Sequence, residues 1–306
     1  MEGMEEISLV KETKYILEKL GHNPRKRYGQ NFLISEEILD RIVKESNITK
    51  EDLVIEIGPG IGSLTKKILD ERCKVIAVEI DRDLSEFLNE RFKMYENFSL
   101  INEDVLKVDL NKVIKDSGYL RENVKIVANL PYYITTPIIL NLFDLNVNSI
   151  TVMVQKEVAE RFTVKEYTKE RSSITYLMEF NADAEILFYV GKNNFMPKPK
   201  IDSAIINLKL KTKEEKEKMV RDVLSEINVS DISLEDILKL SDFTMDIIKF
   251  GFMHKRKKLI KALELSGIDK NKMEKVFDNI GINLNIRAEK ISLNEYIKIS
   301  YLYLFL

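Results

Sequence analysis

Cysteine, histidine, proline and glycine are scarce in this chain, which has 306 residues and only 1, 2, 6 and 11 copies of them. The single cysteine, Cys73, excludes an internal disulfide framework, which is typical of a protein from a reducing compartment. The two histidines, His22 and His254, stand alone without the spacing of metal ligands. We therefore expect no metal site.

Export and membrane signals are also lacking. The first ten residues, MEGMEEISLV, are acidic and do not have the basic region and apolar run of a secretory signal. No apolar run reaches the roughly 18 residues needed to span a bilayer. A soluble, cytoplasmic protein without a membrane partner is expected.

The chain has no excess of either charge, although 32% of its residues are charged, because the formal net charge is only -2. A nucleic-acid partner is therefore not indicated by the total, and positive charge would have to be clustered. Hydrophobic residues make up 44%, enough for a large core. At this length, one large and one smaller domain are expected.

Residues 53 to about 210 alternate between strand-like and helix-like segments, which predicts a mostly parallel sheet with helices on both faces. Strands are expected at 53–57, 74–80, 98–104, 124–129, 149–155, 184–190 and 201–210. The last of them alternates apolar with polar residues, as in an antiparallel strand near a sheet edge. The fold class is therefore α/β. A helical pattern at 6–20 and another after Ser35, a candidate N-cap, precede the sheet.

At about residue 211 the composition changes to charge-rich helical patterns without strand signals. Helices are expected at 213–226, 233–241, 243–265, 269–279 and 292–304. The sequence thus predicts two domains. Residues 1–210 form the α/β domain with a helical N-terminal extension, and residues 211–306 form a small all-helical domain.

The segment VIEIGPGIGSLT places Gly58, Gly60 and Gly62 between the first strand and a helix. Glycines there allow a tight turn and a close approach of the backbone to a ligand at a helix N-terminus. Glu79 ends the second strand and Asp104 ends the third. Each could be a helix cap or a solvated strand end. In this order on three successive strands, they predict a site for a nucleoside cofactor, with Glu79 on the ribose and Asp104 on the adenine amino group.

The segment VANLPYYITTP raises a different question, because an apolar strand ends on an amide, Asn129, followed by a proline and two tyrosines. An adenine amino group is a poor nucleophile, since its lone pair is delocalised into the ring. Two hydrogen-bond acceptors, the Asn129 side-chain oxygen and the Pro131 carbonyl, would favour a more reactive nitrogen. Tyr132 would stack on the base. The plain alternative is a strand-ending turn with a buried tyrosine, which explains Pro131 but not Asn129.

The NLPY segment (129–132) is a signature of adenine-N6 methyltransferases. Four further segments narrow the resemblance: RKRYGQNFL (25–33), EIGPGIGSLT (56–65), MVQKEVAERF (153–162) and FMPKPKIDSAIINL (195–208). Together they resemble the bacterial dimethyladenosine transferase family of the small ribosomal subunit. The resemblance runs from about Arg25 to the end, where RAEKISLNEY (287–296) matches the family's last segment.

The resemblance implies a Rossmann-like class I methyltransferase domain that uses S-adenosylmethionine. It implies dimethylation of two adjacent adenines in the 3′-terminal hairpin of 16S ribosomal RNA, late in the assembly of the small subunit. The cofactor-binding residues implied by the two lines of reasoning are Gln30, Asn31, Leu33, Gly58, Gly60, Glu79, Asp104 and Asn129. Asn129, Pro131 and Tyr132 are the expected catalytic residues.

The chain departs from this family in places. The family usually has asparagine after NLPY, where this chain has Tyr133. After AERF the family often shows Pro-Gly and later Tyr-Gly, whereas this chain has Glu166-Tyr167 and Arg171-Ser172. Residues 211–250 also look longer than usual.

Positive charge is clustered in three places that could contact RNA phosphates, at 25–27, 254–261 and 197–200. The predicted RNA-binding residues are Arg25, Lys26 and Arg27, and Lys255, Arg256, Lys257 and Lys258. The alternative for any single run is a solvated surface.

Two other functions remain open from the sequence. A relative that dimethylates 23S ribosomal RNA and confers macrolide resistance shares the GQNF and NLPY motifs. A ribosome-assembly factor could keep the fold without activity, although Glu79, Asp104 and Asn129 argue against it. A monomer is the default expectation for the oligomeric state.

Overall fold

The computed structural model describes residues 8–21, 30–164 and 171–305. The chain divides into two compact units, the first made of residues 1–160 and 184–210, and the second of residues 161–183 and 211–306. The segment 161–183, which falls in the predicted domain 1–210, thus groups with the second unit. A buried tyrosine of that segment, Tyr176, donates its hydroxyl proton toward the Ala288 and Ile291 carbonyls, at 3.1 and 2.7 Å.

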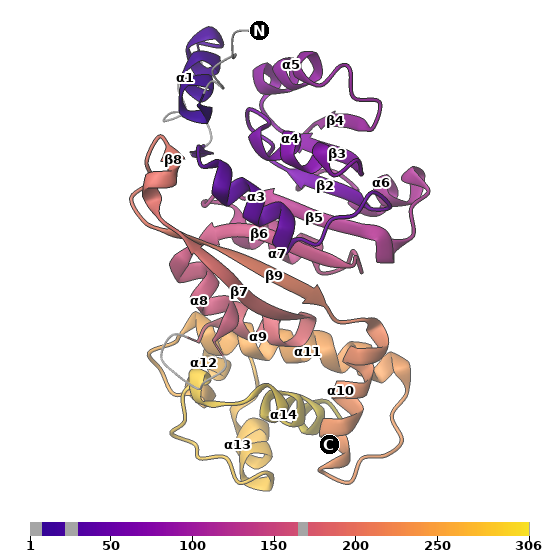
Figure 1. The fold of residues 1–306 in the computed structure, drawn as a ribbon. Helices are drawn as coiled ribbons and strands as arrows, with labels where there is room; N and C mark the ends of the chain where they lie inside the picture. Colours follow the sequence, from indigo (N-terminus) through magenta and orange to yellow (C-terminus); the bar gives the residue numbers. More distant parts are fainter. Residues whose placement is uncertain (1–7, 22–29, 165–170, 306) are drawn as a thin grey trace, which may run out of the picture. The chain divides into compact units, whose positions relative to one another are not determined.

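The first unit is built on a seven-stranded sheet with the order β4-β3-β2-β5-β6-β9-β7 (Figure 1). The strands are β2 (Leu53–Ile57), β3 (Lys74–Glu79), β4 (Phe98–Asn102), β5 (Val124–Asn129), β6 (Ser149–Gln155), β7 (Ala182–Val190) and β9 (Ser203–Leu210). Strands β4, β3, β2, β5 and β6 pair in parallel, and β9 pairs antiparallel with β6. The predicted α/β class, the strands and the antiparallel pairing of 201–210 are confirmed.

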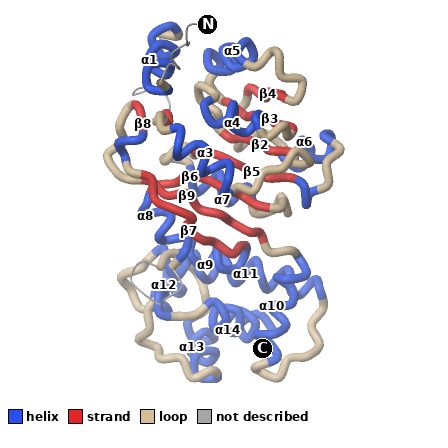
Figure 2. Tube along the Cα trace, viewed as in Figure 1, coloured by secondary structure: helices blue, strands red, loops and turns tan. Residues whose placement is uncertain are grey.

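The central strands are buried and mostly apolar, as expected where helices cover both faces of a parallel sheet, although β2 carries Glu56 and β5 carries Lys125. All five residues of β2 are buried, and so are the first five residues of β5. Figure 2 shows helices lying among and around the strands of the first unit. The helices associated with the sheet are α1 (Leu9–Lys19), α3 (Glu36–Glu45), α4 (Ser63–Asp70), α5 (Arg82–Arg91), α6 (Leu110–Ser117), α7 (Thr135–Leu142) and α8 (Lys156–Thr163).

Local capping explains where several helices begin. The Ser35 hydroxyl accepts a hydrogen bond from the Ile38 amide at 3.4 Å, which confirms Ser35 as the N-cap of α3. Helix α6 was not predicted, although Asp109 caps it by accepting from the Lys112 amide at 3.0 Å.

A small second sheet was also not predicted. Strand β1 (Phe32–Leu33) pairs antiparallel with β8 (Phe195–Met196), with Phe32 opposite Met196 and Leu33 opposite Phe195. The sequence suggested only an irregular segment at 25–33. This pairing ties the segment before the sheet to one about 160 residues later, and no local pattern shows it.

The second unit contains only helices and loops among the described residues of 211–305. Its helices are α9 (Ser173–Asn181), α10 (Lys213–Ser225), α11 (Leu234–Met253), α12 (Leu259–Leu265), α13 (Lys270–Asn279) and α14 (Leu293–Phe305). The predicted boundary between helices at 241–243 is wrong, because α11 runs through it. The predicted helix at 243–265 is also wrong, since the chain leaves the helix at His254 and re-enters at Leu259. The break coincides with four consecutive cations at 255–258, a run that has no apolar side chain to pack against the core.

Candidate functional site

The strand order reverses between β2 and β5, and ligands of open α/β sheets bind beside the carboxyl ends of the strands at such a point. A pocket opens there in the first unit. Its lining includes every predicted cofactor-binding and catalytic residue: Gln30, Asn31, Leu33, Gly58, Gly60, Glu79, Asp104, Asn129, Pro131 and Tyr132. Residues as far apart along the chain as Gln30 and Tyr132 are thus brought into one cavity.

The glycine loop forms one wall, and its backbone explains the glycines. Gly58, Gly60 and Gly62 have φ angles of +67°, +62° and +84°, a region that other residues rarely adopt. A Cβ on Gly60 would lie 3.0 Å from the Phe32 ring, and one on Gly62 would lie 2.6 Å from the Phe92 ring. Gly62 is also the N-cap of α4, so the loop feeds directly into a helix N-terminus.

Glu79 stands at the end of β3 with only 3% of its surface exposed. Its carboxylate accepts hydrogen bonds from the Gly60 amide at 3.2 Å and from the Asp81 amide at 2.9 Å. Burial nevertheless raises the pKa of Glu79 from 4.5 to about 7. The carboxylate therefore fixes the glycine loop and changes charge near neutral pH.

Two polar residues of the pocket were missed from the sequence. Glu56, inside β2, is fully buried, and burial raises its pKa to about 8, while it accepts a hydrogen bond from the Thr65 hydroxyl at 2.6 Å. The sequence feature that could have revealed Glu56 is an acidic residue in the middle of the apolar segment VIEIG. Ser63, the first residue of α4, has a buried hydroxyl oxygen without a partner among the described residues.

Asp104 lies two residues beyond β4, because that strand ends at Asn102 and not at Asp104 as expected. One oxygen of Asp104 accepts a hydrogen bond from the Leu106 amide at 3.0 Å, which holds the carboxylate in a turn at the pocket wall. Ile80, 42% exposed, lines the same pocket and offers an apolar surface that the sequence analysis did not identify.

Asn129 is the last residue of β5, opposite Met153 of β6. Its side-chain amide donates to the Asn31 carbonyl at 3.1 Å. The nitrogen is therefore tied to the segment that carries β1, while the side-chain oxygen has no partner among the described residues. An asparagine held in this way presents its side-chain oxygen as an acceptor to a bound group.

The Pro131 carbonyl does not match the expected role. It already accepts two hydrogen bonds, from the Thr135 hydroxyl at 3.0 Å and from the Ile134 amide at 3.2 Å. A carbonyl has two lone pairs, so both are used inside the turn. The neighbouring Leu130 carbonyl accepts none from the described residues and is the better candidate for a second acceptor beside Asn129.

Tyr132 lies at the pocket with its hydroxyl 2.6 Å from the Ser203 hydroxyl. Ser203 is fully buried at the start of β9, opposite Gln155 of β6. Burial raises the pKa of Tyr132, so the phenol is neutral at physiological pH. The hydrogen bond fixes the ring at the pocket wall, and its partner could not have been identified from the sequence.

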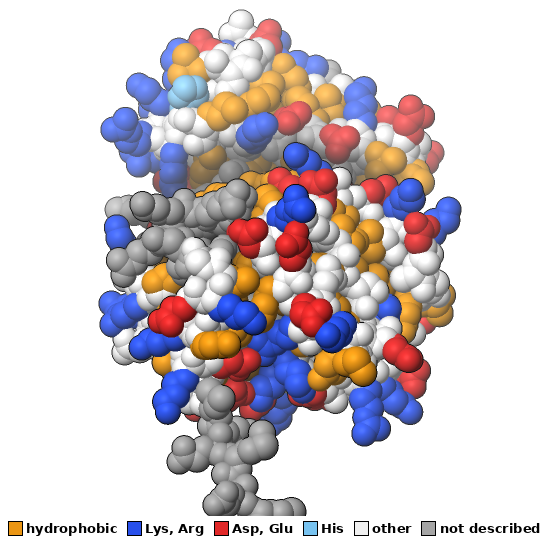
Figure 3. All heavy atoms as spheres, turned by 90° about the horizontal axis from the view of Figure 1, so that it is seen from above, with side chains coloured by type: hydrophobic (Ala, Val, Ile, Leu, Met, Phe, Trp, Pro, Cys, Tyr) orange, Lys and Arg blue, Asp and Glu red, His pale blue; other side chains and the backbone are white. Residues whose placement is uncertain are grey.

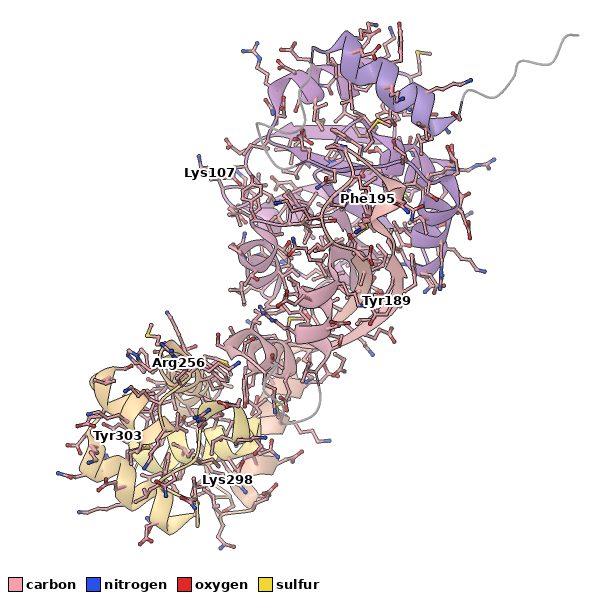
Figure 4. The ribbon with its side chains drawn as sticks, turned by 90° about the vertical axis from the view of Figure 1, so that its left-hand side faces the viewer. Lys107, Tyr189, Phe195, Arg256, Lys298 and Tyr303 are labelled. Atoms are coloured by element: carbon pink, nitrogen blue, oxygen red, sulfur yellow. The ribbon has the colours of Figure 1, made fainter. Side chains whose placement is uncertain are left out.

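The structure describes only the second of the two groups of predicted RNA-binding residues. Arg25, Lys26 and Arg27 lie outside the described residues. Lys255 donates to the Arg171 carbonyl at 2.8 Å, and Lys258 donates to the Asn285 side chain. Arg256 and Lys257 are exposed, and neither side chain has a partner among the described residues; Figure 4 shows Arg256 on the second unit. On the face shown in Figure 3, Lys and Arg side chains lie among Asp and Glu.

Other kinds of site have less support. Within the described residues, no group of three or more His, Cys, Asp and Glu side chains could hold a metal ion. Cys73 is buried, and burial raises its pKa to about 12, so it is an unreactive thiol. In the part of the chain that the structure describes, no helix combines the length and apolar character needed to cross a membrane.

Comparisons with known proteins place this geometry in context. Residues 21–228 match the family described as "Ribosomal RNA adenine dimethylase". The chain is 39% identical to ribosomal RNA small subunit methyltransferase A of Clostridium botulinum (strain Langeland) over 290 residues, which cover 94% of this chain and 97% of that one. The same enzyme of Alkaliphilus oremlandii is 37% identical over 297 residues, covering 96% of both chains.

Solved structures show the same fold. A dimethyladenosine transferase from Plasmodium falciparum superposes with a TM-score of 0.67 and 23% identity, covering 88% of this chain and 95% of that one. The 23S rRNA methyltransferase ErmE superposes with a TM-score of 0.61 and 21% identity, covering 89% and 99%. At these identities the likeness shows the Rossmann-like fold and its helical C-terminal region.

Proposed function

This chain belongs to the ribosomal RNA adenine dimethylase family, and from that premise we propose that it dimethylates the N6 amino groups of two adjacent adenines near the 3′ end of 16S ribosomal RNA. The substrate would be the immature small ribosomal subunit in the cytoplasm, and the enzyme would act as a monomer. The proposal rests mainly on one observation: Asn129, Tyr132 and Glu79 line the same pocket, at the point where the strand order of the sheet reverses.

The pocket suits S-adenosylmethionine, which supplies an electrophilic methyl group when bound. The buried Ser63 hydroxyl without a partner is a polar group placed for a ligand. Glu79 can accept hydrogen bonds from ribose hydroxyls, and Asp104 keeps one carboxylate oxygen for an adenine amino group. Gln30, Asn31, Leu33, Gly58 and Gly60 complete the walls.

The chain's own residues would act on the target adenine by orienting it and polarising its amino group. The Asn129 oxygen and the Leu130 carbonyl accept from that group and favour a more electron-rich nitrogen. Tyr132, fixed by Ser203, stacks on the base, which offsets part of the cost of leaving the RNA stack. No general base is required, because the product nitrogen can release its proton to water. After the first transfer, the nitrogen keeps one proton for these two acceptors.

The test is methyl transfer to purified immature small subunits and to 23S RNA, followed by mass analysis of RNA fragments. We expect two adjacent dimethyladenines in a 3′-terminal fragment of 16S RNA and no label on 23S RNA. Label confined to 23S RNA would indicate the resistance-type activity instead. Binding of S-adenosylmethionine without transfer to either RNA would indicate a non-catalytic assembly factor and would overturn the proposal.

A further inference from the structure

Two consecutive tyrosines occupy one tight turn at the pocket. The Ile134 amide donates to the Pro131 carbonyl at 3.2 Å, which places Tyr132 and Tyr133 at the two central positions of the turn. The Thr135 hydroxyl adds a second hydrogen bond to the same carbonyl at 3.0 Å. Helix α7 begins at once after the turn, so the backbone that carries both rings is held on both sides.

The two rings differ sharply in exposure although both line the pocket. Tyr132 is half-buried and bound through its hydroxyl to Ser203. Tyr133 is 60% exposed and is a second aromatic side chain at the same pocket. A single bound base needs one stacking ring, and Tyr132 supplies it. The second ring therefore has a different use.

We propose that Tyr133 is the stacking platform for the nucleotide next to the target adenine, so that the turn carries one ring for each of two adjacent bases. The inference rests on the proposed function, whose substrate has two neighbouring adenines. A tyrosine on a fixed turn loses little conformational freedom on binding, and a tyrosine ring stacks on any base. Tyr133 would thus hold the RNA while Tyr132 holds the extruded base.

The test uses three variants of the full chain. Tyr133→Ala should lower kcat/KM for immature small subunits roughly 5- to 30-fold, within the range of base–aromatic stacking. Tyr133→Phe keeps the ring and should retain the wild-type rate. Tyr189→Ala, which removes a 52% exposed tyrosine outside the pocket lining, should leave the rate unchanged (Figure 4). Binding of S-adenosylhomocysteine and the unfolding temperature should be the same in all.

The discriminating substrate is a small subunit assembled on 16S RNA in which one of the two adenines is replaced by an abasic residue. Wild type should methylate the remaining adenine more slowly than in normal RNA, and Tyr133→Ala should show no further loss when the neighbouring base is removed. If Tyr133→Ala loses the same factor on normal and abasic RNA, or if it keeps the wild-type rate, the inference is wrong. If wild type methylates no RNA at all, the proposed function fails instead.

Discussion

The carboxyl edge of the sheet and the surface of the helical unit use polar residues in opposite ways. At the sheet edge, polar groups are buried or half-buried, and the two that face the target base are held by distant parts of the chain. Asn129 is bound to Asn31, 98 residues away, and Tyr132 to Ser203, 71 residues away. In the helical unit, Arg256 and Lys257 are exposed and without side-chain partners among the described residues.

The first set of side chains is held in a fixed orientation that suits catalysis, whereas the second set is charge spread over a surface. A side chain that is hydrogen-bonded to a distant part of the chain keeps one orientation, so its loss alone can strongly lower the rate of catalysis. An exposed cation on a long side chain adds a small, salt-screened term that many neighbours could replace. Single substitutions should therefore have large effects at the sheet edge and small, graded effects in the helical unit.

The largest effect is expected at Asn129. Replacing Asn129 with alanine removes an acceptor that is present in a fixed orientation, so we expect kcat for RNA methylation to fall on the order of 10²- to 10³-fold. The measurement is single-turnover transfer of labelled methyl groups to immature small subunits. An unimpaired rate would contradict the mechanism.

Asn97 offers a matched control in the same unit. Its side-chain amide also donates to a backbone carbonyl, that of Cys73, at 2.6 Å, but Asn97 does not line the pocket. Asn97→Ala and Asn129→Ala each remove a side-chain hydrogen bond to a backbone carbonyl, so both should lose stability, by about 1–3 kcal/mol. Only Asn129→Ala should lose the methylation rate. Equal loss of rate in both variants would mean that Asn129 acts through the fold.

The sequence predicted the polar residues at the strand ends because the evidence for them is local. Glu79 and Asn129 each follow an apolar run that can only be a buried strand, and parallel strands place their carboxyl ends together. The helical unit was less predictable. The helix break at 254–258 coincides with four adjacent cations, yet the apolar pattern on both sides favoured one continuous helix over 243–265.

What could not be predicted depends on contacts between distant segments. No spacing in the sequence indicates that the Asn31 carbonyl holds Asn129, that Ser203 holds Tyr132, or that β1 pairs with β8. The sequence indicates the Pro131 carbonyl as an acceptor because proline fixes a turn. Hydrogen bonds from Ile134 and Thr135 close this turn and occupy the Pro131 carbonyl. The Leu130 carbonyl is then the one that can accept from a bound base.

An intermediate effect is expected from pH at Glu79. Its pKa of about 7 means that at pH 6 the carboxyl is mostly protonated, and a protonated carboxyl accepts ribose hydroxyls less well. The affinity for S-adenosylhomocysteine should therefore fall roughly tenfold from pH 8 to pH 6, as measured by calorimetry. Glu79→Gln should bind more weakly at pH 8 and show little change with pH. The same tenfold fall in Glu79→Gln would assign the titration to another group.

The same raised pKa predicts the pH dependence of stability in the unliganded protein. The folded state holds a proton on Glu79 that the unfolded chain releases near pH 4.5. Stability from this group is therefore greatest below pH 4.5 and declines as the pH rises towards 7, by on the order of 3 kcal/mol in total. Glu79→Gln should make this part of the curve of unfolding free energy against pH shallower, and the slope that remains should come from Glu56, whose pKa is also raised, to about 8.

The smallest effect is expected at the two exposed cations of the helical unit. Arg256→Ala and Lys257→Ala should each weaken binding to immature small subunits roughly 1.5- to 5-fold, the range of an exposed ion pair, because each would remove one phosphate contact. The dependence of log affinity on log salt concentration should become shallower by about one for each lost contact. Binding of S-adenosylhomocysteine should not change. Lys255→Ala is the contrasting variant, since this lysine holds the Arg171 carbonyl and its loss should lower stability. An unchanged salt dependence in both Arg256→Ala and Lys257→Ala would assign RNA contact to other residues and leave the helical unit without a demonstrated role in binding.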